Sequence, residues 1–170
     1  MAKTLHTDFY TDQEIYMSSR KKIFAEGWQF IGDRNLVEKP GSCYPFSLLD
    51  QFLDEPLLLT RDSKGQVFCL SNVCTHRGTT LVPAPCQAVN LRCRYHGRQF
   101  RLDGKFLSMP EFKEVKNFPS REDDLTQLPV FEWGPLLFTS LNPGADPEKY
   151  FHAMQERLAW LPIQEFVFKP

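Results

Sequence analysis

Two short segments of the 170-residue chain each pair one cysteine with one histidine. The first is Cys74-Thr75-His76, and the second, sixteen residues further on, is Cys93-Arg94-Tyr95-His96. Thiolate sulfur and imidazole nitrogen are the side-chain donors that bind zinc and iron. Glycine follows closely in both segments, at Gly78 and Gly97, and it permits the turns that bring backbone amides near a charged centre. The spacing therefore predicts a metal centre between two tight loops.

Two kinds of centre fit two cysteines and two histidines. Zinc binds such sets in structural modules, but its usual spacing pairs like ligands, as C-x2–4-C followed by H-x3–5-H. A [2Fe–2S] cluster of mixed ligation holds one iron by two thiolates and the other by two imidazoles. Each segment here supplies one ligand of each type, which favours the iron–sulfur cluster. A zinc-bound structural or interaction module is the alternative.

The donor types also indicate what each ligand does. Cys74 and Cys93 bind the inner iron as thiolates, and His76 and His96 bind the outer iron through one ring nitrogen each. The other ring nitrogens then face solvent or a partner, where electrons and a coupled proton can pass. The sequence therefore predicts an electron-transfer centre without catalytic residues of its own.

These motifs resemble the Rieske family of [2Fe–2S] proteins. The likeness is carried by the segments 72–78, 93–97 and 102–104, which read NVCTHRG, CRYHG and LDG. Upstream, the segments 23–28 and 59–62, IFAEGW and LTRD, extend it over about residues 9 to 145. The layout is similar to the amino-terminal half of the α-subunits of Rieske non-haem iron oxygenases, the aromatic-ring-hydroxylating type.

Residues beside the motifs place the resemblance in the oxygenase branch. The high-potential branch has an extra cysteine in each loop, where this chain has Thr79 and Tyr95, so the loop disulfide is missing. That branch also has a serine after the second His-Gly, whereas Arg98 stands here and many oxygenases have tryptophan. The resemblance implies a low reduction potential, near roughly −150 mV. It also implies a set of residues surrounding the ligands: Arg77, Gly78, Tyr95, Gly97 and Arg98.

The resemblance implies a function in oxygenase chemistry. In that family the Rieske domain takes electrons from a reductase or ferredoxin and passes them to a mononuclear iron, which two histidines and a carboxylate hold in a second domain. His6 and His152, the only other histidines, form no such pattern. We therefore expect an oxidoreductase component that cannot hydroxylate substrate alone, within an α-subunit in which a homo-oligomer is possible. A stand-alone Rieske ferredoxin is the alternative.

Composition limits the kinds of partner and the cellular location that we expect for the chain. The net charge of −1 argues against a nucleic-acid surface, and no apolar run approaches the ~20 residues that a membrane helix needs. The start of the chain resembles no secretory signal, so we expect a cytoplasmic protein in which Cys43, Cys69 and Cys86 are buried, reduced thiols.

Charged residues near the motifs allow two interpretations. The arginines at 92, 94, 98 and 101 form either a docking rim for an acidic redox partner or the outward face of a strand and loop. The acidic residues at 111, 114 and 122–124 are interpreted as a solvated loop between strands.

The surrounding pattern predicts a mainly β fold, an antiparallel β-sandwich with an inserted cluster-binding subdomain and a helix at each end. Residues 1–27 form an extension with a helix that begins at Thr11, where Thr11 and Glu14 make a capping box. Residues 28–145 form the cluster domain, and 146–170 form a helix through Trp160 and a linker toward a catalytic domain absent from the chain. The expected strands are 28–31, 43–49, 56–61, 66–72, 90–92, 99–101, 126–132 and 135–141.

Overall fold

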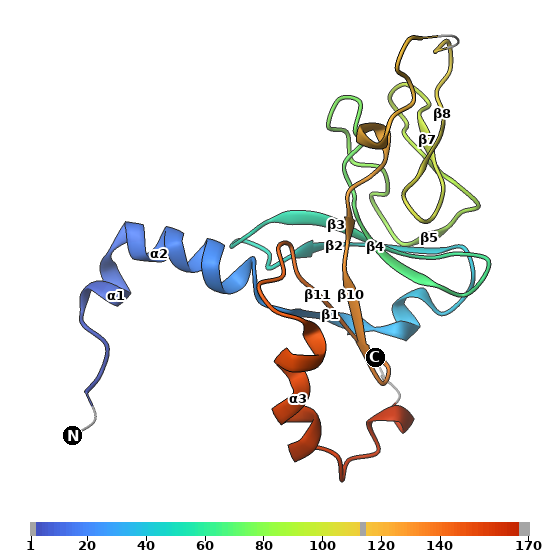
Figure 1. Cartoon of the computed structure of the whole chain (residues 1–170). Helices are drawn as coiled ribbons and strands as arrows, with labels where there is room; N and C mark the ends of the chain where they lie inside the picture. Colours follow the sequence, from blue (N-terminus) through green and yellow to red (C-terminus); the bar gives the residue numbers. More distant parts are fainter. Residues whose placement is uncertain (1–2, 113–114, 167–170) are drawn as a thin grey trace.

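The computed structural model describes residues 3–112 and 115–166, and its base is a pair of antiparallel sheets (Figure 1). The larger sheet has the strand order β5-β2-β3-β4-β9. Its strands are β2 (Ser42–Leu48), β3 (Glu55–Arg61), β4 (Val67–Ser71), β5 (Cys86–Gln87) and β9 (Gln127–Leu128). The smaller sheet has the order β1-β11-β10, with β1 (Gln29–Asp33), β10 (Val130–Trp133) and β11 (Leu136–Thr139). The expected sandwich is confirmed.

Strand β3 is buried on both of its faces, and this places the metal-binding loops above the sandwich. Leu57 and Leu59 belong to the core that also holds Ile31 and Leu137 of the smaller sheet. Leu58 points the other way, into a second core that contains the motif cysteines. Successive residues of a strand face opposite sides, so one central strand connects the base of the fold to the subdomain above it.

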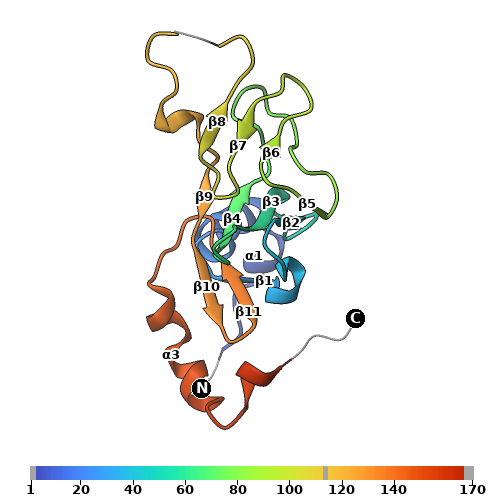
Figure 2. The same cartoon turned by 90° about the vertical axis from the view of Figure 1, so that its right-hand side faces the viewer.

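That subdomain occupies residues 72–126, between β4 and β9, and lies at one end of the molecule (Figure 2). Its own small sheet has the order β6-β7-β8, formed by β6 (Leu91–Arg92), β7 (Gln99–Phe100) and β8 (Phe106–Ser108). A short 3-10 helix, η3 (Arg121–Asp123), leads the chain back to the base. The insertion expected from the motif positions is therefore present.

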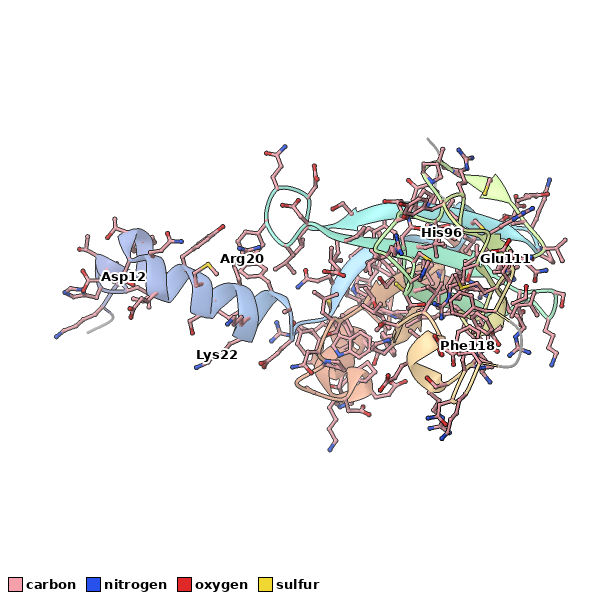
Figure 3. All side chains as sticks on the ribbon, turned by 90° about the horizontal axis from the view of Figure 1, so that it is seen from above. Asp12, Arg20, Lys22, His96, Glu111 and Phe118 are labelled. Atoms are coloured by element: carbon pink, nitrogen blue, oxygen red, sulfur yellow. The ribbon has the colours of Figure 1, made fainter. Side chains whose placement is uncertain are left out.

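The amino-terminal helix differs from the prediction in its start and in its packing. It consists of α1 (Asp8–Thr11), α2 (Gln13–Ser19) and a π-helical turn, η1 (Arg20–Phe24). The predicted cap, Thr11, ends α1, and the Asp12 carboxylate instead accepts hydrogen bonds from the amides of Glu14 and Ile15. The helix projects from the sandwich, with Asp12 near its remote end and Lys22 on the half that leads into the sandwich (Figure 3). Much of its apolar face is accordingly exposed.

The carboxy-terminal helix packs on the smaller sheet through aromatic rings. Helix α3 (Pro147–Arg157) begins at Asp146, as predicted, but ends before Trp160. Its one buried residue, Phe151, stacks on Phe131 of β10 with ring centroids 5.0 Å apart. The remaining short helices are η2 (Arg34–Val37) and η4 (Ile163–Glu165). Within the described ranges, no helix has the length and apolarity needed to cross a bilayer.

The strand predictions have two errors. The predicted strand 126–132 is two strands, β9 and β10, which lie in different sheets on either side of Pro129. Proline lacks the amide needed to continue a ladder, so it marks the point where the chain changes sheet. The short strands β5 and β8 were not predicted, because two or three residues show no periodicity.

Candidate metal centre

The two motif loops are closed by the same pair of backbone hydrogen bonds. In the first, the Cys74 amide donates to the Thr79 carbonyl at 2.9 Å, and the Gly78 amide donates to the Cys74 carbonyl at 3.0 Å. In the second, the Cys93 amide donates to the Arg98 carbonyl at 2.8 Å, and the Gly97 amide donates to the Cys93 carbonyl at 3.0 Å. Both glycines adopt positive φ, 69° and 75°. Each cysteine therefore sits at the start of a turn that glycine makes possible.

Asn72 fastens the base of the first loop. Its buried side chain donates to the Val82 carbonyl at 2.8 Å and accepts from the Val82 amide at 3.0 Å. The backbone carbonyl of Asn72 also accepts from the Leu81 amide at 3.0 Å. These bonds tie the two ends of the loop together, and the motif between them is held in one conformation.

The four predicted ligands meet at the tips of the loops, with sulfur inside and imidazole outside. Cys74 and Cys93 are 2% and 3% exposed, whereas His76 and His96 are both partly exposed. The two imidazole rings lie edge to face with centroids 4.7 Å apart. The Nδ1 atom of His96 is buried and has no hydrogen-bond partner among the described residues. An orphaned ring nitrogen of this kind is available to bind a metal.

This donor set fits a two-iron cluster better than a zinc ion. A structural zinc site gathers four donors around one ion. Among residues 3–112 and 115–166, no three His, Cys, Asp or Glu side chains converge on a single metal position. A mixed-ligand [2Fe–2S] cluster requires only two donors at each iron, which matches a cysteine pair beside a histidine pair.

Local electrostatics favour the ligating form of the imidazole. Desolvation lowers the pKa of His76, and the neighbouring His96, Arg77 and Arg98 lower it further. Burial raises the pKa of Cys74, and the His76 backbone amide and, less strongly, the Arg98 guanidinium oppose that rise. A neutral imidazole and a thiolate are the forms that bind iron, so the positive charge near the loops helps both.

Arg98 does not lie at the rim of the centre, contrary to the expectation from sequence. The residue is 3% exposed, and its guanidinium pairs with Asp123 at 2.5 Å beneath the second loop. Arg101 is also unavailable as a rim charge, since it pairs with Asp103 at 2.8 Å. Arg92, Arg94 and Arg101 are all exposed, so of the four arginines considered only Arg98 is buried.

The surface over the two histidines is a hollow of about 940 Å³ with cationic and aromatic walls. Arg77, Arg92 and Arg94 supply positive charge, and Glu111 supplies one carboxylate. Tyr95, whose ring lies 3.8 Å from that of His96, and Phe112 supply exposed aromatic area. The residues expected around the ligands are thus divided: Arg77, Gly78, Tyr95 and Gly97 border the loops from outside, and Arg98 supports them from within.

The acidic segment is only partly the solvated loop that was predicted. Asp124 accepts a hydrogen bond from the Phe106 amide at 2.7 Å, and Asp123 holds Arg98. Glu114 lies outside the described residues. Sequence reasoning missed the role of Asp123 because its partner is 25 positions away, and no periodic pattern links the two residues.

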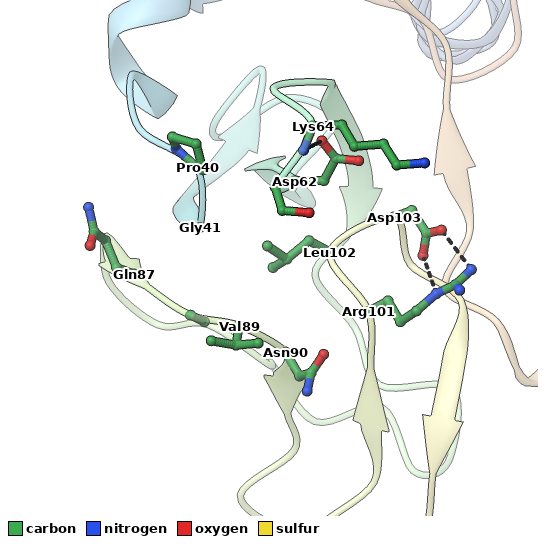
Figure 4. A pocket seen from close by; sticks show the side chains of 12 residues that line it. Pro40, Gly41, Asp62, Lys64, Gln87, Val89, Asn90, Arg101, Leu102 and Asp103 are labelled. Carbon is green, nitrogen blue, oxygen red and sulfur yellow. Dashed lines mark hydrogen bonds and ion pairs between the residues drawn. The ribbon is translucent and has the colours of Figure 1, made fainter.

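A separate hollow of about 610 Å³ lies beside the turn between β3 and β4 (Figure 4). Three of its charged side chains, those of Asp62, Arg101 and Asp103, are engaged within the fold. Asp62 accepts from the amides of Lys64 and Gln66, and Arg101 pairs with Asp103. None of the four predicted ligands lines this pocket.

The remaining cysteines are free thiols, as predicted, but one of them is not buried. Cys43 and Cys69 are enclosed in the two cores, whereas Cys86 is exposed. Cys86 lies on β5 at the edge of the larger sheet, directly across from Cys43. The edge position explains its exposure.

A buried thiol pair beneath a surface imidazole pair defines an iron–sulfur electron-transfer protein of mixed ligation. A model of the Rieske [2Fe-2S] domain matches residues 28–119. The chain belongs to this Rieske family, and its cofactor is one Rieske-type [2Fe–2S] cluster.

Comparison with known proteins points to the oxygenases within that family. Chloroplastic choline monooxygenase of Beta vulgaris is 31% identical over 145 residues, which are 85% of this chain and 32% of that enzyme. The 2-halobenzoate 1,2-dioxygenase large subunit of Burkholderia cepacia is 29% identical over 147 residues, covering 82% of this chain and 30% of the subunit. The chain therefore spans about a third of the curated relatives it matches, at their amino-terminal part.

A solved structure shares the fold over most of the chain. It is a quaternary ammonium Rieske monooxygenase studied for carnitine oxidation by gut microbiota and inter-subunit electron transfer. It superposes with a TM-score of 0.79 over 90% of this chain and 41% of the other, at 23% identity. The relatives are oxidoreductases, and this chain is the Rieske part of such an enzyme.

Proposed function

We propose that Cys74, Cys93, His76 and His96 hold the [2Fe–2S] cluster and that the chain passes single electrons to an oxygenase iron centre outside it. The observation that carries this proposal is the arrangement of the two loops. Their matching closures bring two buried thiols under two adjacent imidazoles, one of which has a buried nitrogen with no hydrogen-bond partner in the described part of the chain. When bound, the cluster supplies a one-electron carrier.

Residues of this chain shield the cluster from water, bind it, and give the electron a route to the surface. Cys74 and Cys93 offer their sulfur atoms inside a hydrophobic core, where little of either side chain is exposed to water. His76 and His96 present their outer ring edges at the surface hollow. A partner that covers this hollow comes within one imidazole ring of the cluster, which suits electron transfer between proteins.

The electron donor is proposed to be an acidic reductase or ferredoxin that docks on the hollow over the histidines. Arg77, Arg92 and Arg94 give that surface its positive charge, and Tyr95 and Phe112 give it apolar area. Complementary charge speeds encounter and orients the partner, so the rate should fall with added salt. Charge reversal by Arg94→Glu is expected to slow reduction by such a donor about tenfold at low salt and to weaken the salt dependence.

The electron acceptor is proposed to be a mononuclear iron in a catalytic domain, on the same polypeptide or a neighbouring subunit. Support comes from the greater length of the relatives and from the inter-subunit electron transfer studied in one of them. In this scheme residues 1–27 form an extension, 28–145 form the cluster domain, and 146–170 lead toward the catalytic domain. A stand-alone ferredoxin is the second candidate. It predicts that the chain reduces a separate oxygenase directly.

Substrate and location are proposed only from the relatives and the composition. Quaternary ammonium compounds are the first substrate class to test, because choline and carnitine enzymes are among the similar proteins, and aromatic compounds are the second. A cytoplasmic location is proposed on the basis of the free thiols, and cell fractionation with an antibody tests it.

Ligand variants test the assignment. Purified protein is loaded with iron and sulfide, reduced with dithionite and measured by EPR and by bound iron. Cys93→Ser and His96→Ala are expected to lose the Rieske signal, whereas Cys69→Ser and Cys86→Ser retain it. A normal signal in either ligand variant contradicts the assignment. Bound zinc with no EPR signal in the wild type would instead support the alternative of a zinc-bound structural module.

A further inference from the structure

A buried ion pair supports the second metal-binding loop from below. Arg98 Nη2 lies 2.5 Å from Asp123 Oδ1 and 3.2 Å from the Asp123 carbonyl oxygen. The side chains of Arg98 and Asp123 are 4% and 19% exposed. A pair with so little contact with water is screened weakly by solvent and salt, and its charges act over longer distances than surface charges do.

Aromatic rings enclose the cationic end of this pair. The Arg98 guanidinium lies 5.0 Å from the centroid of Phe106 and 5.7 Å from those of Phe100 and Phe118. Rings around a guanidinium stabilise the cation and exclude water from it. Arg98 is thus held as a fixed charge, and it cannot turn outward to solvent as a rim arginine could.

Both members of the pair are attached to the metal-binding loops. The Arg98 carbonyl accepts the hydrogen bond from the Cys93 amide that closes the second loop. The Asp123 carbonyl accepts a hydrogen bond from Thr75 Oγ1 at 2.9 Å, between the two ligands of the first loop. Asp123 also caps its own helix, with its carboxylate accepting from the Ser120 amide at 2.7 Å. Asp123 therefore contacts the first loop through Thr75 and the second loop through Arg98.

We infer that Arg98 and Asp123 set the reduction potential of the cluster through their opposite, largely enclosed charges, and that Asp123 holds the two loops in position. This inference rests on the proposed ligand assignment. Reduction adds one electron and hence one negative charge to the centre, with the electron supplied by the reductant. A nearby cation stabilises the reduced state and raises the potential, whereas a nearby anion lowers it.

Neutralising each member separately tests the electrostatic part. Arg98→Gln keeps a hydrogen-bond donor for Asp123, and Asp123→Asn keeps the shape of its side chain. The potential is expected to fall in Arg98→Gln and to rise in Asp123→Asn. Each change is expected to alter the ratio of oxidised to reduced cluster about tenfold, or about 59 mV for a one-electron couple. The double variant should return close to the wild-type midpoint, and Arg98→Lys, which keeps the charge, should restore most of it.

Control variants separate this effect from a general effect of charge. Arg34 of η2 and Glu132 of β10 form an ion pair at 3.4 Å whose side chains are 42% and 37% exposed, away from the metal-binding loops. Arg34→Gln and Glu132→Gln change the net charge of the protein by the same amounts. Because water screens that pair, both variants are expected to keep the wild-type midpoint.

Thr75→Val tests the positional part without a change of charge. Loss of the Thr75 hydroxyl removes the link between the first loop and Asp123, so iron is expected to dissociate several-fold faster in a chelator while the midpoint stays unchanged. Unaltered iron loss would overturn the positional role.

The possible results distinguish the failure of this inference from the failure of the proposed function. If the wild type shows no Rieske EPR signal, the ligand assignment fails. If the wild type shows the signal but Arg98→Gln and Asp123→Asn shift the midpoint in the same direction, or not at all, the pair is only structural. Should Arg98→Gln fail to fold, the rise expected for Asp123→Asn decides the question by itself.

Discussion

The imidazole rings of His76 and His96 lie edge to face with centroids 4.7 Å apart, although twenty positions separate them in the chain. Each ring stands on a loop whose backbone is closed by the same two hydrogen bonds, and this common geometry brings them side by side. One result is a double imidazole edge at the surface, above two buried thiols. A redox partner at this surface therefore meets imidazole first, and the thiols stay enclosed behind it.

The reduction potential should lie at the low end of the Rieske range, near roughly −150 mV. The loops lack the disulfide, since Thr79 and Tyr95 occupy the two positions, and Arg98 replaces the serine that donates to sulfide. Fewer hydrogen bonds to sulfur stabilise the reduced cluster less. A redox titration followed by visible spectroscopy measures the midpoint. A value well above zero at neutral pH would place the protein in the other branch.

Thiol labelling should distinguish Cys86 from the two enclosed cysteines. Burial and the neighbouring Cys86 thiol raise the pKa of Cys43 to about 12, and burial raises that of Cys69 to about 12. At pH 8 only roughly one such thiol in ten thousand is the reactive thiolate, because the pH lies about four units below the pKa. Iodoacetamide should therefore modify the exposed Cys86 alone in the cluster-loaded protein, as read by peptide mass spectrometry. Rapid modification of Cys69 would show that its core opens to solvent.

Alanine at the two loop glycines should destabilise the protein unequally. Both residues have positive φ, which costs a side chain roughly 1–2 kcal/mol. A Cβ at Gly97 would also come within 3.0 Å of Pro110 Cγ, whereas a Cβ at Gly78 meets nothing within 4 Å. Gly97→Ala should therefore lower the free energy of unfolding more than Gly78→Ala, measured by urea denaturation of the metal-free protein. Equal losses would mean that the Pro110 contact relaxes without cost.

The chain alone should accept electrons without hydroxylating a substrate. Supplied with a reductase and a panel of quaternary ammonium and aromatic compounds, it should become reduced and form no product. Addition of a catalytic iron domain from a related oxygenase should then permit product formation, because the second half of the electron path is present. Product is measured by mass spectrometry against a control that contains His96→Ala. Stoichiometric product from the chain alone would reveal a second iron site and overturn the electron-carrier role.

Much of the centre was predictable because its chemistry is local. A cysteine and a histidine one or two residues apart, with glycine just beyond, can form a metal-binding turn with few other residues. The motif spacing therefore indicated the cluster type, and the absence of loop cysteines indicated the branch, while the four ligands stay a prediction. The strands predicted at 43–49 and 56–61 likewise match β2 and β3 of the larger sheet to within one residue at each end.

Other features were decided only by tertiary contacts. The sequence could not show that Arg98 turns inward, because its ion-pair partner, Asp123, lies 25 positions away and is brought near by the return of the chain through η3. It could not show that Cys86 is exposed, because β5 is a two-residue edge strand recognisable only by its pairing with β2. By itself, the sequence determined which atoms can bind the metal, since donor chemistry belongs to individual residues. The folded structure decided which charges act on that metal, since burial and distance exist only after remote segments have packed together.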